Sequence, residues 1–375
     1  MKCYIVFILK RCWKRKINLA LVGLMVLIIS GIFFMNLTNQ DRLKESLETA
    51  KNEYRIQEKE YSLMLDTEND DTDFALDAYN ASIDRIRIYE ELCKEFNAEN
   101  KQDFYKGYIN ILNENKQAAL ENDEHSKEMI EDLSKQLAYF TYLNRHDLDY
   151  EDMNYPIFAL PFLISLFDNI LLLIVLVLSI CICTQIYSFN YHQSMDLGKL
   201  LPYSHKRILL IHVFMSFFIS LGILLGTILF SLLLSLTFTQ NMGIDYPVLM
   251  TTVSNGITDV FLKDLLLSFE ILAFANLLCF VLFQWIHDEM TILLLFMGAS
   301  VLFGYLPGYL GIVKPFVHFI PFSYIQTGNI INGTLASLVE NNQLTLDMGA
   351  LIFGIYIVFL IVCLYFYSNY SRKNT

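Results

Sequence analysis

Long stretches without Asp, Glu, Lys or Arg most constrain how this chain folds. Six of them are apolar and long enough to cross a membrane, since a hydrocarbon core of ~30 Å needs about 20 residues of helix. The first is too long for a cleaved signal peptide, so it predicts a retained span. The sequence therefore predicts an all-α membrane protein with six transmembrane helices, the fourth extending outward if Glu270 is tolerated. The stretches cover residues 17–40, 169–195, 208–244, 271–287, 290–313 and 348–371.

Charge is concentrated in residues 41–155, here called the acidic block. This block holds 29 of the 39 Asp and Glu and 14 of the 27 Lys and Arg, so it carries −15. Only 18% of the whole chain is charged, against about 25% in soluble domains. Nucleic-acid binding needs a basic surface and is disfavoured. Apolar positions spaced by three, four and seven predict a bundle of three or four helices, interrupted by the acidic residues 66–73.

The orientation follows from Lys and Arg in the short segments between spans. Eleven of them precede the first span, follow the sixth, or lie between the second and third. The opposite side has only Lys263 and Lys314 in short segments. Because basic residues are retained in the cytoplasm, both termini are expected there and the acidic block outside. Residues 1–16 predict a basic amphipathic helix lying on the inner membrane surface.

The segment 187–207, here called the coupling loop, is the most informative cytoplasmic stretch. A short helix is expected from about Ser194 to Leu201, because the residue before Pro202 leaves the helical region. Ser204 is then placed to cap the third span. Such a loop is typical of a docking site for a partner, and a simple capped hairpin is the alternative.

The run from Leu201 to Ile208, Leu-Pro-Tyr-Ser-His-Lys-Arg-Ile, resembles the LP-x-S-R/K turn of permease subunits of type-2 ABC exporters. The basic helix before the first span, the six spans and the external segment between spans five and six also resemble that family. The resemblance covers residues 1–40 and 156–375, and the acidic block is an insertion relative to the simplest members.

The resemblance implies a half-transporter of a bacterial plasma membrane. Two copies, or this chain and a sister permease, would form a twelve-span pore, and a separate cytoplasmic ABC ATPase dimer with ATP and Mg would drive it. The ATPase would grip the coupling loop, and its closure would move spans two and three by alternating access. The coupling residues implied are Ser194, Asp196, Gly198, Lys199, Leu201, Pro202, Ser204, Lys206 and Arg207.

Enzyme motifs are missing from the sequence. No G-x-x-x-x-G-K-[ST] string is present to cradle phosphates, so any ATP hydrolysis belongs to another polypeptide. Cys181 and Cys183 form a CxC pair without a second pair or a nearby His, and residues 66–73 lack the spacing of a calcium loop. We therefore expect no catalytic site, cofactor or metal bound by this chain.

Four polar side chains lie within or at the ends of the predicted spans, and such groups are often functional. They are Asp168, His212, Glu270 and Asn276. Interhelical hydrogen bonding or headgroup contact is the favoured role. An ion-coupled carrier using Glu270 is one alternative, and a membrane receptor or assembly scaffold that uses the acidic block is another.

The spans are rich in Leu, Ile and Phe, which favours an apolar or amphipathic cargo: a lipid, an amphipathic peptide or a hydrophobic drug. Residues 314–347, here called the external segment, begin with an aromatic, proline-broken run that is expected to dip into the outer interface. The predicted organisation is an interfacial helix over 1–16, a span over 17–40, the acidic block, and spans two to six within 156–375.

Overall fold

The structure is a computed structural model of the chain. It describes residues 2–66, 72–98, 101–121, 127–188, 191–192, 195–196, 205–249, 254–309, 311 and 313–373. The chain forms two compact units. The first unit comprises residues 1–33, 157–244 and 250–375, and the second comprises residues 34–156 and 245–249.

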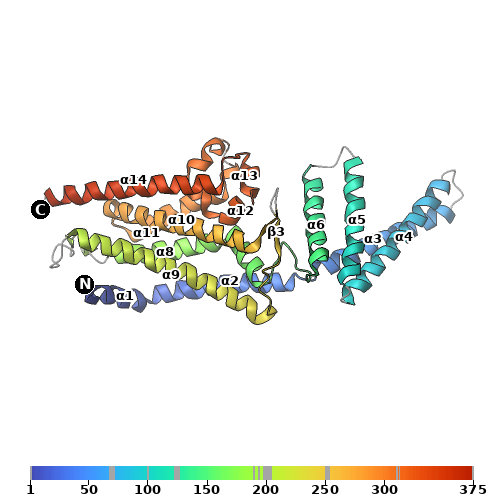
Figure 1. Ribbon diagram of the computed structural model, residues 1–375, viewed down its shortest axis with the longest axis horizontal. Helices are drawn as coiled ribbons and strands as arrows, with labels where there is room; N and C mark the ends of the chain where they lie inside the picture. Colours follow the sequence, from blue (N-terminus) through green and yellow to red (C-terminus); the bar gives the residue numbers. More distant parts are fainter. Residues whose placement is uncertain are drawn as a thin grey trace. The chain divides into compact units, whose positions relative to one another are not determined.

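The first unit is nearly all helical (Figure 1). Five helical segments of the described residues are long and apolar enough to cross a membrane: Lys16–Leu65, Leu171–Ser188, Arg207–Thr239, Ile257–Ile286 and Leu346–Phe366. The helices of this unit are α1 (Lys2–Lys14), α2 (Lys16–Thr38), α7 (Ala159–Asn169), α8 (Leu171–Ser188), α9 (His205–Thr239), α10 (Ile257–Ile286), α11 (Glu289–Ala299), α12 (Thr327–Ile331), α13 (Thr334–Val339) and α14 (Leu346–Lys373).

The predicted fifth span, residues 290–313, is a shorter apolar helix in the structure. It covers Glu289–Tyr305, and its last part, Ser300–Tyr305 (η2), has π-helical geometry. Pro307, which has no backbone N–H to continue a helix, follows at the start of the 3-10 turn Pro307–Tyr309 (η3). At about 1.5 Å per residue such a helix is shorter than a ~30 Å hydrocarbon core. Among the described residues the structure thus shows five candidate spans, and the sixth stays a prediction.

The core of the first unit forms around α8, whose residues are mostly buried against α9, α10 and α11. Helix α9 contributes small residues that are fully buried, and these let neighbouring helices approach closely. They are Ser216, Ser220, Thr227, Ser231 and Ser235. The hydroxyls of Ser220, Thr227 and Ser231 donate to a carbonyl one turn earlier, so these hydroxyls need no acceptor outside the helix.

The external segment folds back onto the bundle instead of forming an open loop. It contains the 3-10 helices η4 (Lys314–Phe319) and η5 (Pro321–Ile325), followed by α12 and α13. Val317, Tyr324 and Ile325 are buried in the same hydrophobic cluster as residues of α8 and α10. The Tyr324 hydroxyl donates to the His318 carbonyl at 2.9 Å, which holds the turn between η4 and η5.

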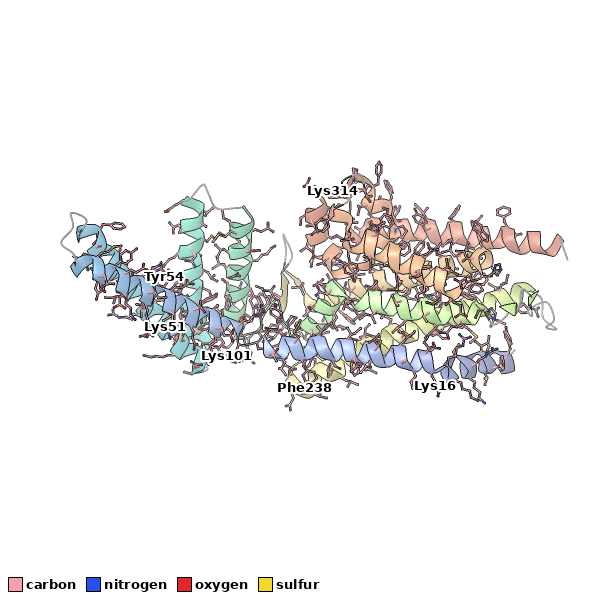
Figure 2. The ribbon with its side chains drawn as sticks, turned by 180° about the vertical axis from the view of Figure 1, so that it is seen from behind. Lys16, Lys51, Tyr54, Lys101, Phe238 and Lys314 are labelled. Atoms are coloured by element: carbon pink, nitrogen blue, oxygen red, sulfur yellow. The ribbon has the colours of Figure 1, made fainter. Side chains whose placement is uncertain are left out.

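The basic residues gather at one end of the first unit. Helix α1, the start of α9 and the C-terminal end of α14 lie at this end (Figure 1). Figure 2 shows Lys16 there, whereas Lys314 and Phe238 lie at the opposite end of the same unit. Ile8 and Cys12 of α1 are buried, so this helix packs on the bundle through its apolar side. Arg15 forms an ion pair with Glu289 at 3.7 Å.

The second unit contains the acidic block and consists of two helical hairpins. Helices α3 (Arg42–Asp66) and α4 (Thr72–Asn97) pack along each other, as do α5 (Lys101–Glu121) and α6 (Lys127–His146). The strand β3 (Pro247–Leu249) contacts α6. Aromatic rings of α4, α5, α6 and the following segment join the hairpins. They belong to Phe96, Phe104, Tyr105, Tyr108, Phe140 and Tyr150.

Candidate functional site

Most of the predicted coupling residues lie outside the described residues. These are Ser194, Gly198, Lys199, Leu201, Pro202 and Ser204. Asp196 is described and belongs to the two-residue strand β2 (Met195–Asp196), which pairs antiparallel with β1 (Tyr191–His192). The helix predicted from Ser194 is therefore wrong at residues 195 and 196, because the backbone there pairs with residues 191 and 192 as a strand. Lys206 and Arg207 stand in the first turn of α9.

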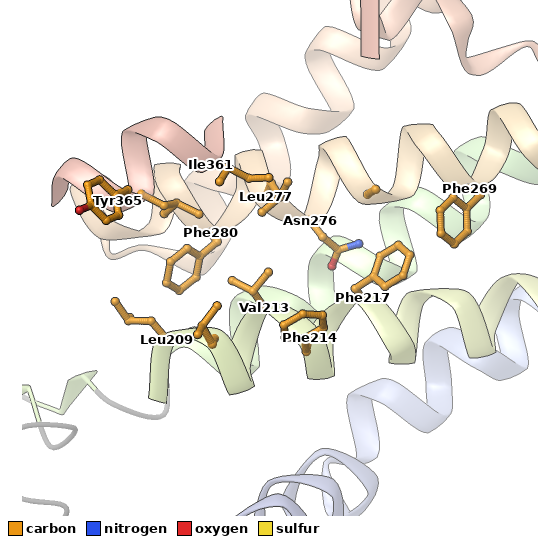
Figure 3. A pocket seen from close by; sticks show the side chains of 13 residues that line it. Leu209, Val213, Phe214, Phe217, Phe269, Asn276, Leu277, Phe280, Ile361 and Tyr365 are labelled. Carbon is orange, nitrogen blue, oxygen red and sulfur yellow. The ribbon is translucent and has the colours of Figure 1, made fainter. Parts of the chain in front are cut away.

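An apolar pocket of about 560 Å³ opens between α9, α10 and α14, beginning just after that first turn. Figure 3 shows its side chains pointing toward one another from these helices. A volume of this size lies within the range of pockets that bind small molecules, roughly 300–1,000 Å³. The lining residues are Leu209, Leu210, Val213, Phe214, Phe217, Phe269, Ala273, Asn276, Leu277, Phe280, Ile361, Leu364 and Tyr365.

A second pocket of about 610 Å³ lies on the other side of α9, against α1. Leu210 and Phe214 line both pockets. Arg207 is the one charged residue among the lining residues of the second pocket. The start of α9 thus carries apolar surface on two faces and a guanidinium at its rim.

Asn276 is the deepest polar residue of the apolar pocket, with 1% of its surface exposed. Its amide nitrogen donates to Ser220 Oγ at 3.1 Å and to the Leu272 carbonyl at 2.7 Å. Its amide oxygen accepts from the Cys183 thiol at 2.8 Å. Asn276 therefore joins α8, α9 and α10 at one point in the pocket wall.

His212 lies nearer the start of α9 and is 1% exposed. Its Nε2 is 2.8 Å from the Tyr4 hydroxyl, and the two rings stack with centroids 5.9 Å apart. The contact links α1 to α9 close to the coupling loop. One turn further, the Tyr187 hydroxyl of α8 is 2.6 Å from Ser216 Oγ.

A buried amide pair that the sequence did not single out joins α2 to α8. Asn18 donates to Gln185 Oε1 at 3.0 Å, and Gln185 donates back to Asn18 Oδ1 at 2.8 Å. Asn18 also donates to the Cys12 carbonyl at the end of α1. The sequence signal for this pair was one amide side chain within each of two apolar stretches.

Three carboxyl groups of the first unit lie in apolar helices, two of them on partly exposed residues and one on a fully buried residue. Glu270 is partly exposed, and its buried Oε2 has no hydrogen-bond partner among the described residues. Asp168 ends α7 and has a buried Oδ1, also unpartnered in the described part of the chain. Asp264, which the sequence analysis did not single out, is fully buried two turns into α10. It was missed because the predicted span began near Ile271, whereas α10 begins at Ile257.

The described cysteine side chains are free thiols, and none of them forms a disulfide. Cys183 is buried, and its thiol donates a hydrogen bond to Asn276 in the pocket wall. This hydrogen bond explains a buried thiol at that position. Where side chains are described, no group of three or more His, Cys, Asp or Glu is positioned to hold a metal ion.

Comparison with known proteins gives no relative: no family model, curated protein or solved structure matches this chain.

Proposed function

We propose that this chain is the membrane-embedded permease subunit of an ATP-binding cassette exporter of the type-2 family. The proposal rests on the Leu201–Ile208 run, on the long apolar helices, and on the basic end of the first unit where α1 and the start of α9 meet. In this proposal both termini are cytoplasmic, Glu289–Tyr305 completes six spans, and the acidic block is extracytoplasmic.

The observation that carries the proposal is the position of the apolar pocket relative to the coupling loop. Leu209 and Leu210 of the pocket wall come two and three residues after Arg207. A rigid α9 would transmit any push on the coupling loop directly into this wall. The reciprocal contact of Tyr4 with His212 would carry α1 with the same movement.

The pocket chemistry selects the cargo class. Among the lining side chains only Asn276 and Tyr365 have polar groups, and the Asn276 amide is engaged with Ser220, Leu272 and Cys183. A hydrophilic solute would lose its water there without replacement hydrogen bonds, at a cost of roughly 1–3 kcal/mol for each group. We therefore propose a lipid, an amphipathic peptide or a hydrophobic drug as cargo.

The energy source in this proposal is an ABC ATPase dimer that binds ATP and Mg on the cytoplasmic side. A second copy of this chain or a sister permease would complete the twelve-span pore. ATP-driven closure of the dimer would shift the coupling loop, turn α8 and α9 against the partner permease, and expose the pocket to the other side.

Co-purification in mild detergent tests the proposal. A P-loop ATPase should co-elute with the wild-type chain and be lost from Gly198→Asp and Leu201→Asp, because both place a charge in the coupling loop. Gly256→Asp and Leu338→Asp are matched controls at other positions. A Cβ on Gly256 meets no atom within 4 Å, and Leu338 is 62% exposed. Both controls should retain the ATPase.

Two results would contradict the exporter proposal. One is a wild-type chain that co-purifies with no ATPase and moves solute unaided. The other is equal ATPase recovery from all four variants. The second candidate function is an ion-coupled carrier, which the unpartnered carboxyl oxygens of Asp168, Asp264 and Glu270 favour. A carrier would show gradient-driven flux that the coupling-loop variants leave unchanged.

A further inference from the structure

Four oxygen-bearing side chains gather where α7, α10 and α12 contact one another, at a distance from the apolar pocket. They are Asp168, Asp264, Ser268 and Thr327, here called the carboxyl cluster. Each of the three helices packs against the other two. None of the four residues lines either pocket described above.

The members of the cluster are brought together by several independent contacts. Asp264 and Ser268 stand one turn apart on α10 and so share a face. Thr327 lies beside the Asp264 carboxyl, and Asp168 interacts electrostatically with Asp264. Asp168 Oδ1 also packs directly on Gly328, the residue after Thr327, so that a Cβ at Gly328 would overlap it. The four side chains therefore belong to one contact region of α7, α10 and α12.

The cluster is buried and its oxygens lack partners. Asp264, Ser268 and Thr327 are each 0% exposed. Asp168 Oδ1, Asp264 Oδ1 and Oδ2, Ser268 Oγ and Thr327 Oγ1 form no hydrogen bond of normal geometry among the described residues, although the Thr327 hydroxyl is close enough to the Asp264 carboxyl to interact with it. Since buried polar atoms are nearly always bonded, five orphans at one place indicate a missing partner.

No cation of the described residues supplies that partner. Neither Asp168 nor Asp264 takes part in an ion pair there, and Lys263, the adjacent base, is bonded to Asp259 at 2.6 Å on the exposed side of α10. Helix α12 and the rest of α7 contain no charged residue. If ionised, the two carboxylates would stand uncompensated in an apolar setting, so they either bind a counter-charge or carry protons.

We propose that Asp168, Asp264, Ser268 and Thr327 form a binding site for a calcium-sized divalent cation. All five orphan atoms are oxygens, the ligands that hard cations prefer. Two carboxylates give a charge of −2, which a divalent ion neutralises and a monovalent ion does not. Calcium accepts irregular sets of six to eight oxygens, whereas magnesium demands near-ideal octahedral geometry. Asp168 is partly exposed, so water can reach the remaining coordination positions.

A shared proton is the competing explanation for the cluster. Protonation of both carboxyls would remove both charges and add two O–H donors, and the Ser268 and Thr327 hydroxyls are donors as well. Protons and a cation compete for the same carboxylates, so cation affinity should rise with pH while the carboxyls still carry protons. A proton-only site would respond to pH and ignore calcium.

The test measures thermal stability and ⁴⁵Ca²⁺ binding of the full-length protein in detergent, with excess chelator or with CaCl₂, MgCl₂ or NaCl at constant ionic strength. Calcium should raise the melting temperature of the wild type by several degrees. Asp264→Asn should abolish this rise and lower calcium affinity by more than about tenfold, since even outer-shell partners of a metal contribute about 10–100-fold. In chelator, the same variant should melt higher than the wild type because it removes an uncompensated charge.

Two further variants keep the test decisive. Thr327→Val removes one ligand without changing the charge and should weaken calcium binding while leaving stability in chelator nearly unchanged. Asp259→Asn lies on the same helix in an exposed ion pair and should retain the full calcium response. It controls for the loss of a single carboxylate from α10.

Three outcomes would overturn the proposal. An equal calcium response in the wild type and in Asp264→Asn would assign the effect to the acidic block. A pH response without any calcium response would make the cluster a protonated pair. A response to sodium or magnesium alone that depends on Asp264 would remove the calcium assignment.

Discussion

At the scale of single residues, the polar groups inside the bundle of the first unit serve as interhelical connections. Asn276 contacts α8, α9 and its own helix, and the Asn18–Gln185 pair joins α2 to α8. Each of these side chains provides hydrogen-bond partners for its neighbours as well as for its own polar atoms. Removing one partner should therefore cost more than its own hydrogen bond.

Substitution of Asn276 tests this reading. Asn276→Leu should destabilise the protein by about 1 kcal/mol, since interhelical hydrogen bonds in membranes contribute about 0.6 and up to 1.7 kcal/mol. Asn276→Asp should cost more, because a charge at the centre of a membrane helix costs about 2.5–3.5 kcal/mol. Thermal unfolding in detergent ranks the two. Ser231→Ala, which loses only a bond within α9, should change little, and the ranking fails if Asn276→Asp melts with the wild type.

The sequence identified some of these residues because a polar side chain within a long apolar stretch is visible without a structure. His212 and Asn276 were found in this way, and both are buried. Asp264 was not found, since its neighbour Lys263 looked like the end of a span. Whether a carboxyl next to an exposed lysine is buried depends on which face of the helix each residue occupies. That face can be predicted only when the first residue of the helix is known.

At the scale of elements, the external segment packs closely against α14. Tyr324 of η5 is fully buried and contacts Phe353 of α14 edge to face, with ring centroids 5.7 Å apart. The close approach is possible because Gly349 of α14 has no side chain. A Cβ there would lie 2.7 Å from Tyr324 Cε1.

Gly349→Ala should therefore destabilise the protein by about 1–3 kcal/mol, the usual cost of overpacking a filled core. The tyrosine ring cannot move aside because its hydroxyl is bonded to the His318 carbonyl. Gly354→Ala on the same helix is the matched control, since its Cβ would meet no atom within 4 Å. Thermal melting of the two variants should differ by several degrees, and equal melting temperatures would mean that the external segment does not pack on α14.

Element type was easier to predict than element length. Apolar stretches predicted the long helices, but the π-helical turn at Ser300–Tyr305 ended the fifth one early. Gly304 in this run and Pro307 just after it both disfavour a helix, and η2 also packs against η5, where a Cβ on Gly304 would lie 3.2 Å from the Phe322 carbonyl oxygen. The strand pair at residues 191–196 was missed for a related reason, because a tight hairpin and a short helix share the same polar residues.

At the scale of the whole molecule, the two units are stabilised by different chemistry. The first unit buries aliphatic side chains, phenylalanine rings and small hydroxyls within long apolar helices. The second unit, with its dense charge, relies on a cluster of aromatic rings between its hairpins. Several of the tyrosine hydroxyls also bond to backbone, such as Tyr105 to the Leu148 carbonyl and Tyr139 to the Glu151 carbonyl.

This difference predicts that the second unit is the alkali-sensitive part of the molecule. Burial raises the pKa of Tyr108 to about 12, and burial likewise raises the pKa of Tyr105, Tyr139 and Tyr150. A tyrosine in the unfolded chain ionises near pH 10. The folded unit therefore keeps its full stability below about pH 10 and loses it as the pH rises further, by about 1.4 kcal/mol per pH unit for each such tyrosine.

Absorbance at 295 nm and circular dichroism, followed together from pH 9 to pH 12, measure the predicted loss. The part of the absorbance change that belongs to the buried tyrosines of the cluster should coincide with the loss of helix, because burial disfavours their ionised form until the hairpins separate. Tyr108→Phe removes one titrating group from the cluster and should move the step to higher pH. Tyr79→Phe, in the same unit but outside this cluster, is the matched control. Ionisation of all the tyrosines near pH 10 with the helices intact would show that the aromatic cluster is open to water.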